Sequence, residues 1–141
     1  MDEEIRSQVI LPDSKGGLIV AVTTIRELYP VANAKVMVFT GNAQNMQTVD
    51  SDSTDQSGRT KRFILDTPPK SLSLNSGNTQ LPYSRYNILI EADGYISNLY
   101  YDVPVFSGIT SIQSSNMMLS ETAGVNKTPT IFNESQQFNL Q

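Results

Sequence analysis

The chain has 141 residues, and its 10 Lys and Arg against 14 Asp and Glu give a formal net charge of −4. This length fits one domain, and a negative field repels a phosphate backbone, so nucleic acid is not an expected partner. The chain contains no Cys and no His, which excludes disulfides, Cys-based zinc sites, a thiol nucleophile and an imidazole base.

No membrane segment is expected, because no run approaches the ~20 apolar residues of a membrane helix. The first four residues, MDEE, are acidic where a secretory signal is basic. We therefore expect no membrane insertion and no signal peptide in this chain.

The hydrophobic pattern predicts strands separated by turns, with almost no helical periodicity. In chain order, the expected strands are 18–25, 34–39, one that begins at 46–49, 59–65, 86–91, 96–103 and 109–119. The second has apolar residues on both faces, which indicates an interior strand or one whose outer face meets a partner. Residues 50–58 are dense in Asp, Ser, Thr and Gly and predict a turn. Residues 70–82 read as a polar insertion between two strands.

About seven strands with turns at short intervals predict an all-β fold, a single Greek-key β-sandwich of the transthyretin-like or immunoglobulin-like kind. The expected organisation is an N-terminal segment at 1–15, the sandwich at 16–119, and a C-terminal tail or linker at 120–141.

Three motifs occur in order along the chain: PVANAKV at 30–36, TDQSGR at 54–59 and YNILIEADGY at 86–95. Together they resemble the carboxypeptidase regulatory-like and transthyretin-like (prealbumin-like) β-sandwich domains. The resemblance implies that Asp55, Gly58, Gly94 and Tyr95 define two tight turns. Positive φ is expected at both glycines, because a Cβ disfavours that conformation, and Tyr95 is expected to fold back onto the edge of the sandwich.

Two further segments, PYSRYN at 82–87 and VPVFSGI at 103–109, are similar to the domain carried by clostridial spore-cortex-lytic enzymes and related cell-wall proteins. That similarity implies a bacterial accessory module beside peptidoglycan chemistry, located at the cell wall or spore. It implies no catalysis by this domain. The connection before residue 84 is longer than is usual in the family, and it could shape a partner surface.

The candidate sites each have a simpler alternative. Asp50, Asp52 and Asp55 carry enough oxygens for calcium, or they cap a turn through hydrogen bonds to the backbone. A Lys–Asn isopeptide bond would use Lys35 with Glu91 as the assisting buried acid, although Lys35 does not match the first-strand lysine of pilin and adhesin sandwiches; the alternative is that both residues face solvent. A catalytic carboxylate pair remains formally open, but no spacing selects two of the acids for opposite roles. We expect no enzyme activity, no cofactor and no metal.

The candidate binding face consists of Tyr100, Tyr101 and Phe106, whose rings suit stacking on a sugar or simple packing in the sandwich. The expected function is a non-catalytic interaction or accessory module of bacterial cell-wall or spore-cortex proteins. Its expected partner is another protein or a neighbouring catalytic domain, or peptidoglycan itself. Two alternatives stay open: a carbohydrate-binding module, and a structural subunit of a surface particle in which the tail residues Ile131, Phe132, Phe138 and Leu140 dock onto a neighbour.

Overall fold

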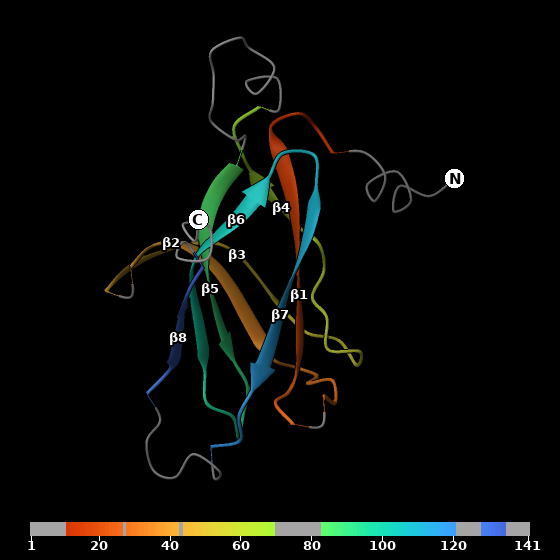
Figure 1. Ribbon diagram of the computed structural model, residues 1–141, viewed down its shortest axis with the longest axis vertical. Coiled ribbons are helices and arrows are strands. Elements are labelled where there is room, and N and C mark those ends of the chain that lie inside the picture. Colours follow the sequence, from red (N-terminus) through yellow and green to blue (C-terminus); the bar gives the residue numbers. More distant parts are fainter. Residues whose placement is uncertain (1–10, 27, 43, 70–82, 121–127, 135–141) are drawn as a thin grey trace, which may run out of the picture.

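The computed structural model describes residues 11–26, 28–42, 44–69, 83–120 and 128–134 (Figure 1). These residues form eight strands in two sheets and no helix, so the fold is an all-β sandwich. The strands are β1 (Lys15–Thr24), β2 (Lys35–Asn42), β3 (Asn45–Ser53), β4 (Phe63–Asp66), β5 (Tyr83–Glu91), β6 (Asn98–Phe106), β7 (Thr110–Met117) and β8 (Thr130–Asn133).

The smaller sheet has the order β4-β1-β7, and the larger one has the order β3-β2-β5-β6-β8. Two of the pairings, β1 with β7 and β6 with β8, are parallel, and the other strand pairs are antiparallel. Strands β3, β4, β7 and β8 therefore lie at the four sheet edges in the described part of the chain.

The core lies between the two sheets and is built from the alternating inner positions of the strands. On β5, Tyr86, Ile88 and Ile90 are buried in it, as their alternation predicted. The other core side chains are Leu18, Val20, Val22, Val31, Ala34, Val36, Val38, Phe63, Leu65, Tyr100, Val103, Val105 and Met117. At ~2 kcal/mol for each large buried side chain, this core is the main favourable term for folding.

A bulge between β5 and β6 changes which face the residues of β6 present. The register shifts between Tyr86 and Ile88, and Asp102 opposite has a φ of 60°. The Asn87 side chain stabilises this irregular backbone, since its Oδ1 accepts the Asp102 N–H at 3.0 Å and its Nδ2 donates to the Gly41 carbonyl at 2.8 Å. A bulge of this kind redirects the side chains on either side of it.

Several predicted boundaries differ from the structure. The predicted strand 59–65 is a strand only over Phe63–Asp66, because side chains interrupt its backbone pairing with β1. The Val20 N–H on β1 donates to Thr60 Oγ1, and the Lys61 N–H donates to Asp52 Oδ2. The predicted turn 50–58 begins later, since β3 continues to Ser53. Strand β8 lies within the predicted tail, which extends the larger sheet beyond residue 119. The predicted insertion 70–82 lies outside the described residues.

Candidate interaction surfaces

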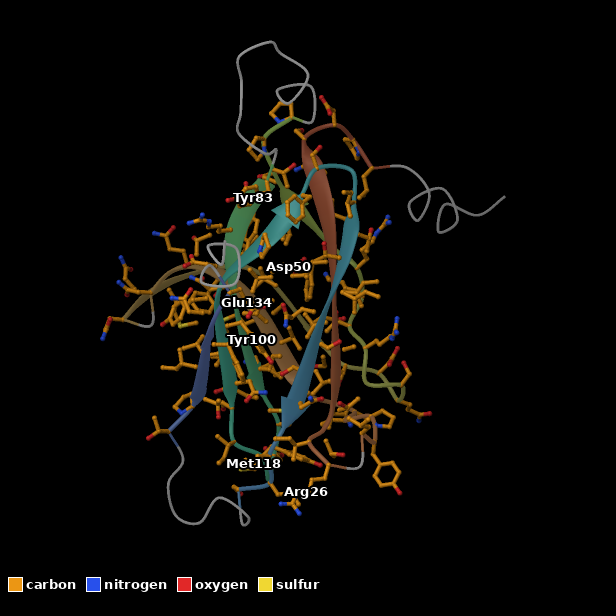
Figure 2. All side chains as sticks on the ribbon, in the orientation of Figure 1. Arg26, Asp50, Tyr83, Tyr100, Met118 and Glu134 are labelled. Carbon is orange, nitrogen blue, oxygen red and sulfur yellow. The ribbon has the colours of Figure 1, made fainter. Side chains whose placement is uncertain are left out.

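The residues of the predicted aromatic face do not lie on one face of the sheet. Tyr100 and Tyr101 are successive residues of β6, so their side chains point to opposite faces of the sheet. Tyr100 is only 5% exposed, and its hydroxyl donates to Ser115 Oγ at 2.8 Å. Its ring stacks on Phe132 with 4.6 Å between centroids. Burial raises the pKa of Tyr100, and the bond with Ser115 opposes that shift. Tyr100 is therefore a structural residue that joins the two sheets (Figure 2).

Phe106 lies farther along β6, where its ring packs against Tyr83 with 5.3 Å between centroids. Tyr101 is half-buried on the opposite face from Tyr100. The three predicted residues therefore do not come together as one surface.

The first predicted turn is held by its own side chains. Asp55 Oδ1 accepts hydrogen bonds from the backbone N–H of Ser57 at 2.9 Å, from Ser57 Oγ at 2.6 Å and from the N–H of Arg59 at 3.1 Å. The Ser57 hydroxyl is the main reason that the pKa of Asp55 is lowered. Gly58 has a φ of 83°, and a Cβ there would lie 2.5 Å from the Val22 carbonyl oxygen. The turn is therefore tightly built against β1.

The second predicted turn joins β5 to β6. Gly94 has the expected positive φ, 84°, and its carbonyl accepts the Ser120 N–H at 2.9 Å. Tyr95 is partly buried against the core and forms an antiparallel bridge with Leu119. The chain after β7 therefore closes one end of the sandwich together with this turn.

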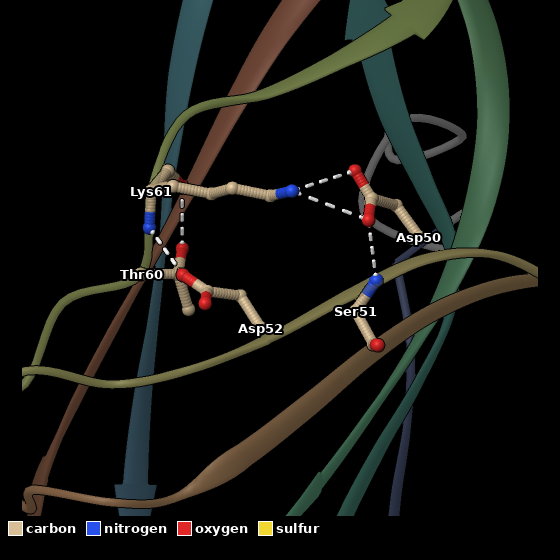
Figure 3. Close-up of polar contacts among 5 residues, drawn as sticks. All are labelled: Asp50, Ser51, Asp52, Thr60 and Lys61. Atoms are coloured by element: carbon tan, nitrogen blue, oxygen red, sulfur yellow. Dashed lines mark hydrogen bonds and ion pairs between the residues drawn. The ribbon is translucent and has the colours of Figure 1, made fainter.

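Two of the three clustered acids, Asp50 and Asp52, bond to different groups of Lys61 (Figure 3). Asp50 pairs with the Lys61 ammonium at 3.2 Å, and Asp52 Oδ2 accepts the Lys61 N–H at 2.8 Å. Asp55 caps its own turn. Within the described part of the chain, no three acidic side chains are grouped as a metal site. Asp55 therefore has the role of the turn-capping alternative, whereas Asp50 and Asp52 lie on β3 and bond to Lys61.

Lys35 and Glu91 are directly opposite each other on β2 and β5, and both are exposed. An isopeptide bond needs a buried assisting acid, and Glu91 is exposed. The two residues therefore match the solvent-facing alternative.

The tail residues Ile131 and Phe132 belong to β8, which pairs with β6 of the same chain. Ile131 is 59% exposed, and Phe132 lies on Tyr100. Phe138 and Leu140 lie outside the described residues.

A surface that the sequence did not predict lies where β1 and β7 end. We call it the apolar end, and it consists of Ile25, Leu28, Tyr29, Met118 and Leu119, which are between 36% and 62% exposed. Four of them, all except Leu28, line a hollow of about 620 Å³ together with Thr24, Arg26, Pro30, Tyr95 and Met117. In Figure 2, Arg26 and Met118 mark this end, and Tyr83 lies at the opposite end of the molecule.

Backbone hydrogen bonds fix both walls of the hollow. The Ile25 N–H donates to the Met117 carbonyl at 3.1 Å, which continues the pairing of β1 with β7. The loop after β1 turns back through a bond from the Thr24 N–H to the Tyr29 carbonyl at 2.8 Å. Leu28, in this loop, has a φ of 60°, which is uncommon for a residue with a side chain of this size. The exposed apolar side chains are therefore held on ordered backbone.

The apolar end could have been suspected from one local signal, the apolar residues Leu28 and Tyr29 inside a turn. Met118 and Leu119 come from about ninety residues farther along the chain, and their proximity to Ile25 follows from the parallel pairing of β1 with β7.

No protein-family model and no curated protein matches this chain. The described residues include no helix with the length and hydropathy of a membrane span.

Proposed function

We propose that this chain is a non-catalytic interaction module that contacts a protein partner through the apolar end. The observation that carries the proposal is the grouping of four exposed apolar or aromatic side chains, Ile25, Tyr29, Met118 and Leu119, around one hollow. Contiguous apolar surface of this kind marks protein contact sites, whereas scattered apolar residues need no explanation.

The chemistry of the surface favours a polypeptide over a sugar. Four of the five exposed residues are flexible aliphatic or thioether side chains, and Tyr29 is the one exposed ring among the five. A sugar-binding face stacks the sugar on flat rings beside hydrogen-bonding groups, so a surface that is mostly aliphatic suits a polypeptide better. Arg26 is the charged residue in the described lining, which suits a partner with a carboxylate beside its apolar contact residues.

The non-catalytic part of the proposal is supported by composition. A chain without His or Cys has neither of the residues that most often act as general base and thiol nucleophile. The association with bacterial cell-wall or spore-cortex proteins rests on the resemblance of the segments at 82–87 and 103–109 to the domain carried by spore-cortex-lytic enzymes. A sandwich fold alone specifies no function.

The test is co-sedimentation with two wall preparations, one that retains its proteins and one stripped of them by protease. Binding to the first preparation alone supports a wall-associated protein partner. Binding to both preparations would show that the protein contacts peptidoglycan itself. Binding to neither would contradict the association with the wall. Time-dependent release of soluble wall fragments would contradict the non-catalytic part.

The double variant Met118→Ser with Leu119→Ser assigns the contact to the apolar end, because both residues line the hollow and their change should abolish saturable pelleting. Val49→Ser with Ile64→Ser is the matched control, since these residues are 47% and 43% exposed but lie on β3 and β4, outside the hollow. Equal loss in the control would mean that general surface hydrophobicity, and not the apolar end, causes the pelleting.

A further inference from the structure

The edge of β7 is the second feature of the molecule suited to a partner, and it is independent of the apolar end. Two hydrogen bonds show which residues of β7 face β1. The Gly17 N–H donates to the Ile109 carbonyl at 2.9 Å, and the Ile25 N–H donates to the Met117 carbonyl. In a parallel ladder, alternate residues direct both their N–H and C=O groups to the same side. The odd-numbered residues of β7 therefore bond to β1, and the even-numbered ones face away from it.

No strand in the described ranges pairs with the outward side of β7, where the backbone groups of Thr110, Ile112 and Ser114 lie. The Ser114 carbonyl accepts Gln113 Nε2 at 3.0 Å, an exposed bond from a side chain of the same strand. Farther along, the Asn116 carbonyl accepts Asn98 Nδ2 at 2.9 Å, and Ser115 Oγ bonds to Asn98 and Tyr100, so the second half of this edge is joined to the other sheet.

A slot of about 370 Å³ lies beside the first half of this edge. The core residues Leu18 and Val103 line it, together with Ser111 and Gln113 from the inner face of β7. Its remaining lining consists of Pro104, Phe106, Ile112 and Glu134. The slot thus joins unpaired backbone groups to an apolar lining, which is what an added strand needs for affinity and for side-chain specificity.

The sequence of β7 gives this edge no protection against pairing. Natural edge strands are protected by charges, prolines or bulges. No charged residue occurs from Val103 to Ser120, and β7 itself contains no Pro and no register shift. At the opposite edges, β3 carries Asp50 and Asp52, and β4 is only four residues long.

We propose that β7 accepts an extended segment of a partner polypeptide as an added strand of the smaller sheet. A single extended chain fits better than the edge of a second copy, because the slot is walled by β7 on one side and by Pro104, Phe106 and Glu134 on the other. The segment would carry apolar side chains at alternate positions, which face Leu18 and Val103. It would also carry a Lys or Arg beside Glu134, for which the described residues supply no ion-pair partner.

The experiment is selection of short random peptides on the immobilised protein, followed by affinity measurement against the variant Ile112→Pro. This change removes an outward N–H and leaves the bonds of β7 to β1 in place, and proline is tolerated at such an edge position. We expect binding peptides with alternating apolar residues and a basic residue, weakened about tenfold or more by Ile112→Pro. Ile112→Thr, which keeps the N–H, should bind within about threefold of the wild type.

A second measurement keeps the test independent of the variant's folding. Each selected peptide is made in two N-methylated forms, one methylated at the odd amides and one at the even amides. Only the form that lacks the N–H donors facing β7 should fail to bind. The proposal is overturned if no peptide is enriched, or if both forms bind alike. It is also overturned if light scattering shows a dimer that Ile112→Pro dissociates, since β7 would then pair with a second copy.

Discussion

The two open sides of the sandwich are built from different residue types. On one side, which we call the charged side, residues 54–62 run from β3 toward β4, and Lys61 bonds to Asp50 and Asp52 (Figure 3). The other side, which we call the uncharged side, consists of β7 and the slot beside it, and it has no charge from Val103 to Ser120. The charged side is covered by the chain's own backbone and ion pairs, whereas no strand in the described ranges covers the outward side of β7. The difference indicates that the uncharged side is the one available to a partner.

The glycines of the two sides should differ most in their tolerance of a side chain. Gly58→Ala on the charged side should cost about 3 kcal/mol or more, because positive φ is strained and the new Cβ would lie 2.5 Å from the Val22 carbonyl oxygen. Gly108→Ala, before β7, has the same sign of φ but open space around it, so about 1 kcal/mol is expected. Urea denaturation measures both, and equal costs would contradict the tight packing at Gly58.

Proline substitution should distinguish the β7 residues whose N–H groups face β1 from those whose N–H groups face outward. Gln113→Pro removes an N–H that faces β1 and should cost about 2 kcal/mol or more, because it leaves a buried carbonyl of β1 unpaired. Ser114→Pro removes an outward N–H and should cost less than about 1 kcal/mol. Thermal unfolding of the two variants measures both costs. A larger cost for Ser114→Pro than for Gln113→Pro would show that the odd-numbered residues do not face β1.

The polar link between the sheets should also stabilise the uncharged side. Ser115 Oγ bonds to Asn98 Nδ2 and to the Tyr100 hydroxyl, both at 2.8 Å. Ser115→Ala should therefore cost about 2 kcal/mol, since two buried polar groups lose a partner. Ser114→Ala, one residue earlier on the exposed face, should change the free energy of unfolding by less than about 0.5 kcal/mol. Similar values for both would mean that the link is not formed.

Stability should fall at alkaline pH through two tyrosines. Burial raises the pKa of Tyr100 and of Tyr86, whose hydroxyl donates to the Asp66 carbonyl at 2.6 Å. A raised folded-state pKa gives stability that is complete below the unfolded value of about 10 and is lost as pH rises through the folded value. Tyr100→Phe and Tyr86→Phe should each flatten this decline. A decline unchanged in both variants would contradict this assignment.

The ion pair on the charged side should contribute least to stability. Lys61 and Asp50 are both well exposed, and such pairs contribute ~0.5 kcal/mol and weaken with salt. Lys61→Met should therefore change the free energy of unfolding by less than about 1 kcal/mol, with the difference reduced at high salt. A larger cost would show that the Lys61 side chain makes stabilising contacts besides its ion pair with Asp50.

The sequence predicted the elements that depend on local pattern. Alternation on β5 identified the buried side chains of Tyr86, Ile88 and Ile90, and turn chemistry identified Gly58 and Gly94. The predicted aromatic face did not form one surface because Tyr100 and Tyr101 project to opposite faces and Phe106 lies beyond the bulge at Asp102.

Long-range pairing was not predictable in the same way. Strand β8 has four exposed residues and joins its sheet by a parallel pairing, so it has no period-two burial pattern of its own. The apolar end and the slot both depend on β7 lying parallel to β1, a contact between residues about a hundred positions apart. Such surfaces are assembled by topology, and single-segment patterns contain no signal for them.

Residue-resolved amide hydrogen exchange along β7 tests the difference between the two sides most directly. We predict strong protection at Ser111, Gln113 and Ser115, and rapid exchange at Thr110, Ile112 and Ser114, because only the first set is bonded to β1. Uniform protection of both sets would contradict the account, since the edge of β7 would then already be paired.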